Sequence, residues 1–106
     1  MANRAFFLNT LHEGVDPADY EAWIRRVDYP IARSKEPILS YEVTRLEGHL
    51  DGSDNPLPAQ YLEVVEITDL EAYTTGLATD EEVVQLLKEW ATYVASSVAV
   101  HGELIV

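Results

Sequence analysis

The sequence contains no cysteine, so it can form no disulfide, thiolate nucleophile or cysteine-ligated zinc or iron–sulfur site. Basic residues are also scarce: 7 Lys and Arg stand against 19 Asp and Glu, for a formal net charge of -12. Phosphate backbones and anionic lipids repel such a chain, so we expect it to bind neither nucleic acid nor membranes. The plainer interpretation of this charge is solubility.

Long apolar runs are missing as well. No segment reaches the length of a membrane span, and the first residues lack the apolar core of a signal peptide. A cytoplasmic location is therefore the default expectation.

Sequence motifs for cofactors and metals are absent too. There is no glycine-rich phosphate loop, so we expect no nucleotide cofactor. Its three histidines, His12, His49 and His101, show no His-x-His or His-Glu-x-x-His spacing, so we expect no metal site. No Ser-His-Asp or Cys-His arrangement is indicated. Whether the protein is an enzyme at all stays open at this level.

Two sequence periods alternate in the order strand, helix, strand, strand, helix, strand. Residues 5–11 are mostly apolar and predict a strand. Asp16-Pro17 predicts a helix start, because Asp caps free backbone N–H groups and Pro is tolerated at the first helical position. An apolar stripe follows at helical spacing. Pro30 predicts a kink or break near Asp28-Tyr29, with Tyr29 pushed from helical angles and a short continuation toward Ser34.

A strand completes the first strand–helix–strand unit, and a second such unit follows it. Residues 38–47 and 60–67 predict strands, which a loop rich in Gly and Pro over 48–58 joins into a hairpin. Capping boxes at 68–71 and 79–82 predict a short helix and then a longer one. Residues 98–106 predict the last strand.

Such an order is typical of an α+β fold: a ferredoxin-like βαββαβ antiparallel sheet that forms a single domain over residues 1–106. The strands carry apolar side chains on both faces, whereas helices can cover only one. A homodimer with its two sheets face to face, a dimeric α+β barrel, is therefore expected. A small chain leaves room for a pocket at the seam between helices and sheet.

Three segments carry a resemblance to a known family: Asp19-Tyr20-Glu21-Ala22-Trp23, Asp28-Tyr29-Pro30 and Ile38-Leu39-Ser40-Tyr41-Glu42-Val43. Together they resemble the REDY-like (HapK-type) family of the dimeric α+β barrel superfamily. Its members are found beside biosynthetic genes for tripyrrole red pigments of the prodigiosin type, and relatives are linked to cyclisation of reactive bis-indole intermediates. The resemblance implies a small protein that handles an aromatic, nitrogen-containing intermediate.

The first two of these segments are also similar to the EthD-like pattern, an aromatic helix followed by His-x-Pro. Asp28 stands where that pattern has His. Some polyketide cyclases of this barrel type place a catalytic His at the start of the longer second-half helix, where this chain has Thr79-Asp80-Glu81-Glu82. Both departures argue against transferring histidine chemistry to this chain.

Asp28 and His12 are the candidate proton-handling groups. Asp28 ends the aromatic stripe beside the helix break, where burial would raise its pKa and suit it to move a proton. The alternative is that Asp28 caps backbone amides freed near Pro30. His12 ends the first strand and could border a pocket, or it could be an exposed turn histidine.

Five further residues are candidates for substrate binding. Asn9 is polar within an apolar strand and must find partners in the protein or a ligand. His101 could line the more polar face of the sheet or contact a second subunit. Trp23, Tyr41 and Trp90 suit stacking on a flat ring, and equally suit core packing.

Two strand residues outside this set draw attention. Glu63 and Glu66 point to opposite faces of the third strand by alternation, and the sequence does not say which one is buried.

Together with these candidate residues, the resemblance implies a cofactor-independent enzyme or accessory factor of secondary-metabolite biosynthesis, of the prodigiosin-like pigment or bis-indole type. It would promote cyclisation or condensation of an aromatic intermediate by proton transfer. The alternatives are a non-catalytic protein that binds or shields a reactive metabolite, and a cofactor-free monooxygenase. One fold hosts many functions, so the fold does not separate them.

Overall fold

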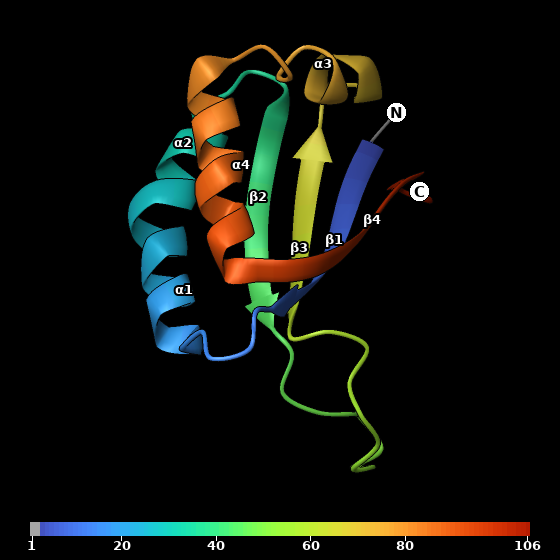
Figure 1. Cartoon of the computed structure of the whole chain (residues 1–106). Helices are drawn as coiled ribbons and strands as arrows, with labels where there is room; N and C mark the ends of the chain where they lie inside the picture. Colours follow the sequence, from blue (N-terminus) through green and yellow to red (C-terminus); the bar gives the residue numbers. More distant parts are fainter. Residues whose placement is uncertain (1–2) are drawn as a thin grey trace.

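A four-stranded antiparallel sheet in the order β2-β3-β1-β4 forms the body of the protein, with its helices packed on one face (Figure 1). The computed structural model describes residues 3–106; Met1 and Ala2 of the predicted domain lie outside the described residues. The elements are β1 (Asn3–Leu11), α1 (Pro17–Trp23), the π-helical segment η1 (Ile24–Asp28), α2 (Tyr29–Arg33), β2 (Ile38–Arg45), β3 (Tyr61–Ile67), α3 (Leu70–Thr74), α4 (Glu81–Tyr93) and β4 (Val94–Glu103). The prediction of a ferredoxin-like α+β fold is confirmed.

Register fixes which side chains face the helices. Along β3 the alternate residues Tyr61, Glu63, Val65 and Ile67 are buried, and the residues between them are only partly buried. β1 lies between β3 and β4 and pairs antiparallel with both. β2 pairs antiparallel with β3, so the predicted hairpin is present, and the loop between them extends away from the sheet (Figure 1).

The first helical region is continuous through Pro30, which corrects the expected departure of Tyr29 from helical angles. Tyr29 has φ -57° and ψ -50°, and its backbone N–H donates to the carbonyl of Ile24, five residues earlier. The wider π turn inserts one residue into the helix. Pro30 then falls in the first turn of α2, where its missing N–H is tolerated. Short π-helical insertions of this kind are frequent at functional sites.

Aspartates, not threonines, cap the helices of the second half. Asp69 accepts from the backbone N–H of Ala72 at 2.8 Å, and Asp80 accepts from those of Glu82 and Val83 at 3.0 and 3.2 Å. Both predicted helices are present, but each is capped one residue later than expected, by the Asp that follows the Thr of the predicted capping box. An ionised carboxylate is also favoured at this position by the helix dipole.

The final strand begins earlier than expected, at Val94 and not Val98, because α4 ends at Tyr93. On α4 the buried side is centred on Leu86, while Leu87 is 55% exposed. No helix of the described residues combines the length and apolar character needed to cross a membrane.

The face of the sheet without helices carries an apolar patch on β1, β3 and β4. Phe6 pairs with Val64 and Val100, and Leu8 pairs with Leu62 and Val98. These six residues point away from the helices, because the neighbouring position Phe7 lies on the helix side. We call them the open face: Phe6, Leu8, Leu62, Val64, Val98 and Val100.

Candidate functional site

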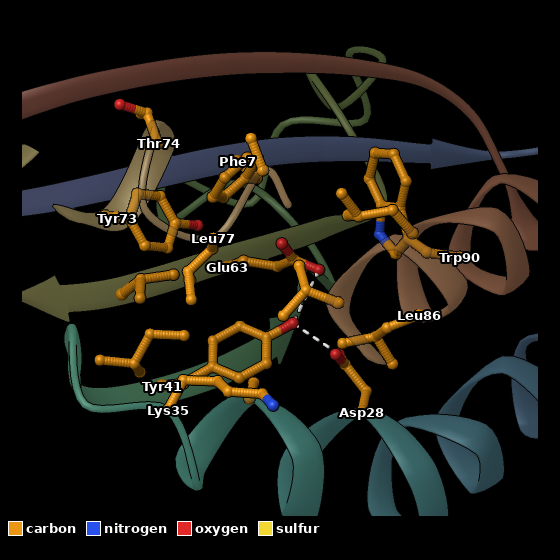
Figure 2. Close-up of a pocket in the computed structure, with 16 residues that line it drawn as sticks. Phe7, Asp28, Lys35, Tyr41, Glu63, Tyr73, Thr74, Leu77, Leu86 and Trp90 are labelled. Atoms are coloured by element: carbon orange, nitrogen blue, oxygen red, sulfur yellow. Dashed lines mark hydrogen bonds between the residues drawn. The ribbon is translucent and has the colours of Figure 1, made fainter. Parts of the chain in front are cut away.

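A cavity of about 350 Å³ lies between the helices and the sheet. Its volume is at the lower end of the range for small-molecule sites. Strands supply one wall and α4 the opposite wall, while α2 and the segment around α3 close two sides (Figure 2). Its lining is mostly apolar: Phe7, Ala32, Ile38, Val65, Leu77, Ala78, Val83, Leu86, Leu87 and Trp90, together with Asp28, Lys35, Tyr41, Glu63, Tyr73 and Thr74.

Three polar side chains meet inside this apolar cavity (Figure 2). The Tyr41 hydroxyl lies 2.5 Å from Oδ2 of Asp28 and 3.1 Å from Oε1 of Glu63. Asp28 comes from the end of η1, Tyr41 from β2 and Glu63 from β3. We call these three residues the carboxyl cluster.

Asp28 occupies the position that the sequence suggested, at the seam of helix and sheet. Its side chain is 4% exposed and makes no capping hydrogen bond at the start of α2, so the capping alternative is not what the structure shows. Burial raises its pKa to about 6, and the hydrogen bond from Tyr41 and the charge of Arg33 partly oppose this rise. A carboxyl with this pKa exchanges protons readily near neutral pH.

Glu63 is the functional candidate that sequence reasoning left undecided. It is 5% exposed, and burial, followed by repulsion from Asp28, raises its pKa to about 7. Glu66 lies on the opposite face of β3, where its Oε2 is 3.4 Å from Arg4. Strand alternation separated the two glutamates, but only the position of the helices shows which one is buried.

The neighbouring tyrosines are held in the protonated state. Burial and then the charge of Glu63 raise the pKa of Tyr41 well above its usual value, and the same two causes raise that of Tyr73 to about 12. The Tyr20 hydroxyl lies 3.5 Å from Oε1 of Glu63, and the pKa of Tyr20 is raised for the same reasons. These phenols therefore act as hydrogen-bond donors and not as bases near neutral pH.

Arg33 positions the strand that carries Tyr41. Its Nη2 and Nε donate to the backbone carbonyl of Tyr41 at 2.8 and 3.1 Å, and its guanidinium stacks 3.8 Å from the centre of the Tyr29 ring. The Tyr29 hydroxyl in turn accepts from the backbone N–H of Val43 at 2.8 Å. The helix containing Pro30 is thereby fixed against β2, and Asp28 is held opposite Tyr41.

The structure brings only some of the predicted site residues together. Asp28, Tyr41 and Trp90 line the cavity. The predicted binding residue Trp23 is instead buried in the core, where its indole N–H donates to Glu89 at 3.1 Å. Asn9 is fully buried on β1 outside the cavity lining, and neither atom of its amide has a hydrogen-bond partner within the described residues.

Neither of the two candidate histidines lines the cavity. His12 is exposed after β1, with its Nε2 3.0 Å from the carbonyl oxygen of Ala91. His101 is exposed on β4, which forms an edge of the sheet. The structure thus separates the predicted pair of proton-handling groups, Asp28 and His12. Within residues 3–106 no cluster of three or more His, Asp or Glu side chains could hold a metal ion.

Comparison with known proteins identifies the family of this chain. The model of the family described as REDY-like protein HapK matches residues 3–105, almost the entire chain. The chain belongs to the HapK family. Among proteins with curated descriptions, none matches it.

Several solved structures share this fold. HapK from Hahella chejuensis is 22% identical, with a TM-score of 0.72 over 96% of this chain and 92% of that one. An EthD family protein from Bacillus halodurans is 17% identical, with a TM-score of 0.74 over 99% and 100%. A protein from Thermobifida fusca, described as dimeric and ferredoxin-like, is 17% identical, with a TM-score of 0.70 over 98% and 92%. At these identities the likeness of a HapK-family chain to each structure concerns the fold.

Proposed function

We propose that this HapK-family protein binds a small aromatic metabolite in the cavity and promotes its cyclisation or condensation by proton transfer from Asp28. The observation that carries the proposal is the buried carboxyl of Asp28, with a pKa of about 6, in the lining of a mostly apolar cavity. An apolar wall favours a flat ring, and a carboxyl at one end can hold an N–H or protonate a ring position.

The biological setting that we propose is secondary-metabolite biosynthesis, with a pyrrole- or indole-containing intermediate of the prodigiosin or bis-indole type. The family membership of residues 3–105 supports this setting. The small cavity supports a ligand of a few rings, because its volume of about 350 Å³ leaves little space beyond that. Asp28 is then the acid or base, and Tyr41 and Trp90 orient the ring.

Indole is a suitable probe for binding. We expect it to shift the backbone amide resonances of α4 residues in the cavity wall. Val83→Trp, which places a large side chain in the cavity, should remove these shifts, whereas Val84→Trp on the neighbouring position outside the lining should not. Equal binding by both variants would contradict the cavity as the site.

Proton transfer can be measured on the same probe as exchange of the indole C3 hydrogen in deuterated water. A carboxyl in contact with C3 adds a deuteron and then removes the proton, so we expect exchange faster by roughly 100-fold than in buffer. Asp28→Asn should abolish this acceleration and keep binding. Asp19→Asn, an exposed aspartate of α1, is the matched control.

A non-catalytic binding protein is the second candidate function. The predominance of apolar groups in the cavity lining favours it, because shielding a reactive metabolite needs exclusion of water and no acid. Tight binding of indole without accelerated exchange in the wild-type protein would select this candidate over the enzyme.

We also propose a homodimer through the open face. Val98 and Val100 are 61% and 54% exposed in the single chain, and they lie beside four further apolar residues of the sheet. Exposed apolar patches of this kind mark interaction sites. Light scattering after gel filtration should give twice the chain mass. Val98→Lys should shift the protein to the monomer, and a dimer unchanged by this substitution would contradict the proposal.

A further inference from the structure

The Tyr41 hydroxyl makes more hydrogen-bond contacts within the carboxyl cluster than its single proton can satisfy. A phenol carries one proton, yet its oxygen lies within hydrogen-bond distance of Oδ2 of Asp28 and Oε1 of Glu63. If both carboxyls were ionised, the Tyr41 oxygen would contact one of the two carboxylate oxygens with no hydrogen between them. Both contacts are satisfied when one carboxyl is protonated and donates to the tyrosine oxygen.

The two distances favour Glu63 as the carboxyl that holds the proton. The contact of 2.5 Å to Asp28 is that of a hydroxyl donating to an ionised carboxylate, whereas the contact of 3.1 Å to Glu63 is longer than such a bond. In the arrangement that satisfies both contacts, Tyr41 donates to Asp28 and accepts from a protonated Glu63. The raised pKa of Glu63, about 7 against about 6 for Asp28, agrees with this direction.

Among the described residues no cation contacts either carboxyl directly, and the charge of Arg33 acts on Asp28 without a salt bridge. Of the two basic residues near the cavity, Lys35 is engaged by Asp80 at 3.1 Å and Glu82 at 2.7 Å, and Arg33 donates to the carbonyl of Tyr41. Within the described residues neither carboxyl forms a salt bridge. The other titratable groups that face them, Tyr20 and Tyr73, are neutral phenols. A single negative charge is all that this buried site can hold without strong repulsion.

We propose that Asp28 and Glu63 share one proton through the Tyr41 hydroxyl and act as a base and acid pair that moves a proton between two atoms of one bound ring. This inference rests on the proposed function and extends it from one carboxyl to two. Of the two reactions proposed above it selects cyclisation over condensation, because relocating a proton within one ligand is an isomerisation that consumes no oxidant, reductant or second substrate.

The proton balance closes within the cluster. Asp28 takes a proton from one atom of the ligand, which breaks a C–H or N–H bond, while Glu63 donates its proton to a second atom of the ligand. Asp28 is then protonated and Glu63 ionised. The Tyr41 hydroxyl passes its own proton to Glu63 and accepts the proton of Asp28, which restores the starting state.

The shared proton can be observed without any ligand. The infrared carbonyl stretch of a carboxylic acid is distinct from that of a carboxylate, so the band reports a protonated buried carboxyl. We expect intensity for one group in the wild-type protein between the two pKa values, about 6 and about 7. Glu63→Gln should remove this band, and Glu66→Gln on the other face of the strand should leave it. Absence of the band in the wild type would overturn the inference even if indole exchange is accelerated.

The paired action can be tested with β-tetralone, a neutral bicyclic ketone whose α-hydrogens exchange when a base removes one and an acid protonates the carbonyl oxygen. We expect the exchange rate to follow a bell-shaped pH profile in the wild type and to fall by roughly 100-fold in both Asp28→Asn and Glu63→Gln. Residual activity of Glu63→Gln should lose the alkaline limb of the profile, because the acid is gone. A packing role for Glu63 would leave the profile bell-shaped, and that result would overturn the inference.

Tyr41→Phe tests the role of the tyrosine hydroxyl separately from that of the two carboxyls. We expect it to keep indole binding and to lower exchange of β-tetralone by about tenfold or more, because the cluster no longer resets through the hydroxyl. Unchanged exchange would overturn the role of Tyr41. An infrared band in a wild-type protein that exchanges neither probe would confirm the shared proton but overturn the proposed function, and the relay with it.

Discussion

Two tyrosine–carboxyl contacts join the first helical region to the sheet, and their electrostatics are opposite. Glu21 on α1 accepts from the Tyr61 hydroxyl at 2.7 Å, and Asp28 on η1 accepts from the Tyr41 hydroxyl at 2.5 Å. Hydrogen bonds from Arg45 and then Tyr61 lower the pKa of Glu21 to about 2, whereas burial raises that of Asp28 to about 6.

This difference indicates that the presence of a cation such as Arg45, and not the tyrosine, sets the ionisation state of each carboxyl. Arg45 reaches Glu21 with two nitrogens, at 2.7 and 2.5 Å. Asp28 and Glu63 lie in an apolar cavity with no comparable salt bridge, so the hydration that their charged forms lose is only partly replaced by hydrogen bonds and by the charge of Arg33. One contact pairs a carboxylate with a cation, while the other leaves a buried carboxyl with a raised pKa.

The two regions should therefore destabilise the protein at opposite ends of the pH scale. The pKa values of Asp28 and Glu63 are higher in the folded chain than their ordinary values. Their contribution to stability is complete below those ordinary values and is lost as pH rises through about 6 and 7. Glu21 behaves in reverse: its contribution is present above its ordinary pKa and is lost as pH falls toward about 2.

The largest expected effect comes from removing the buried charge. Asp28→Asn or Glu63→Gln should raise the free energy of unfolding at pH 8 by roughly 2 kcal/mol, because each shift in pKa exceeds one unit. At acid pH, where the wild-type carboxyls are already neutral, the gain should disappear. Urea denaturation at both pH values measures this, with Asp19→Asn and Glu66→Gln as controls. Destabilisation at pH 8 would contradict the assigned cost of burial.

A cation placed beside the carboxyl cluster should make it resemble Glu21. Leu87 lines the cavity and is half exposed, so Leu87→Lys can reach the cluster while its chain stays partly in solvent. We expect the pKa of both Asp28 and Glu63 to fall by about one unit. Carbon-13 NMR titration of the labelled carboxyls reads the shift. Val84→Lys, which faces away from the cavity, should leave both values unchanged.

Removing the charge of Glu21 should have a smaller effect. Glu21→Gln is expected to cost about 1 kcal/mol near neutral pH, since a partly exposed ion pair is screened by water. It should also remove the acid-side loss of stability attributed to this group. Glu47 contacts the same Arg45 at 3.4 Å but is largely exposed, so Glu47→Gln is the matched control and should change little. Equal effects of the two variants would show that burial does not matter here.

The smallest effect on stability is expected from Arg45→Met, which keeps the apolar stem and removes the cation. The pKa of Glu21 should rise toward its ordinary value, because the hydrogen bond from Arg45 that lowers it most is lost. That of Asp28 should stay at about 6. NMR titration of the two carboxyls in one sample tests both statements, and a coupled change would show that the two regions are not electrostatically independent.

Much of the fold was predictable from local patterns. Alternation and helical spacing placed every strand and each main helix, and the cap at Asp16 is present, with its side chain accepting from the N–H of Ala18 at 2.9 Å. The consequence of Pro30 was predicted less well. A kink was the local expectation, and the chain instead adopts a π turn that keeps Tyr29 helical. Packing of the stripe on both sides of Pro30 against the sheet favours a continuous helix.

The candidate site was predictable in part. The sequence marked Asp28 because a carboxyl stood at the end of an aromatic stripe beside a helix irregularity, and the cavity is where that reasoning placed it. It gave no comparable signal for Glu63. His12 has the chemistry of a general base, but its position after β1 leaves it exposed and outside the cavity lining.

The order of elements, the net charge of -12, the absence of cysteine chemistry and the two-faced apolar strands belong to this protein by sequence alone. These properties depend on residue type and on neighbours along the chain, so they can be read locally. Tertiary structure alone decided that Asp28, Tyr41 and Glu63 meet, because they come from three elements whose contact depends on sheet order and register. It also decided their ionisation, since the pKa of a carboxyl follows from the burial and charges around it, which no local pattern records.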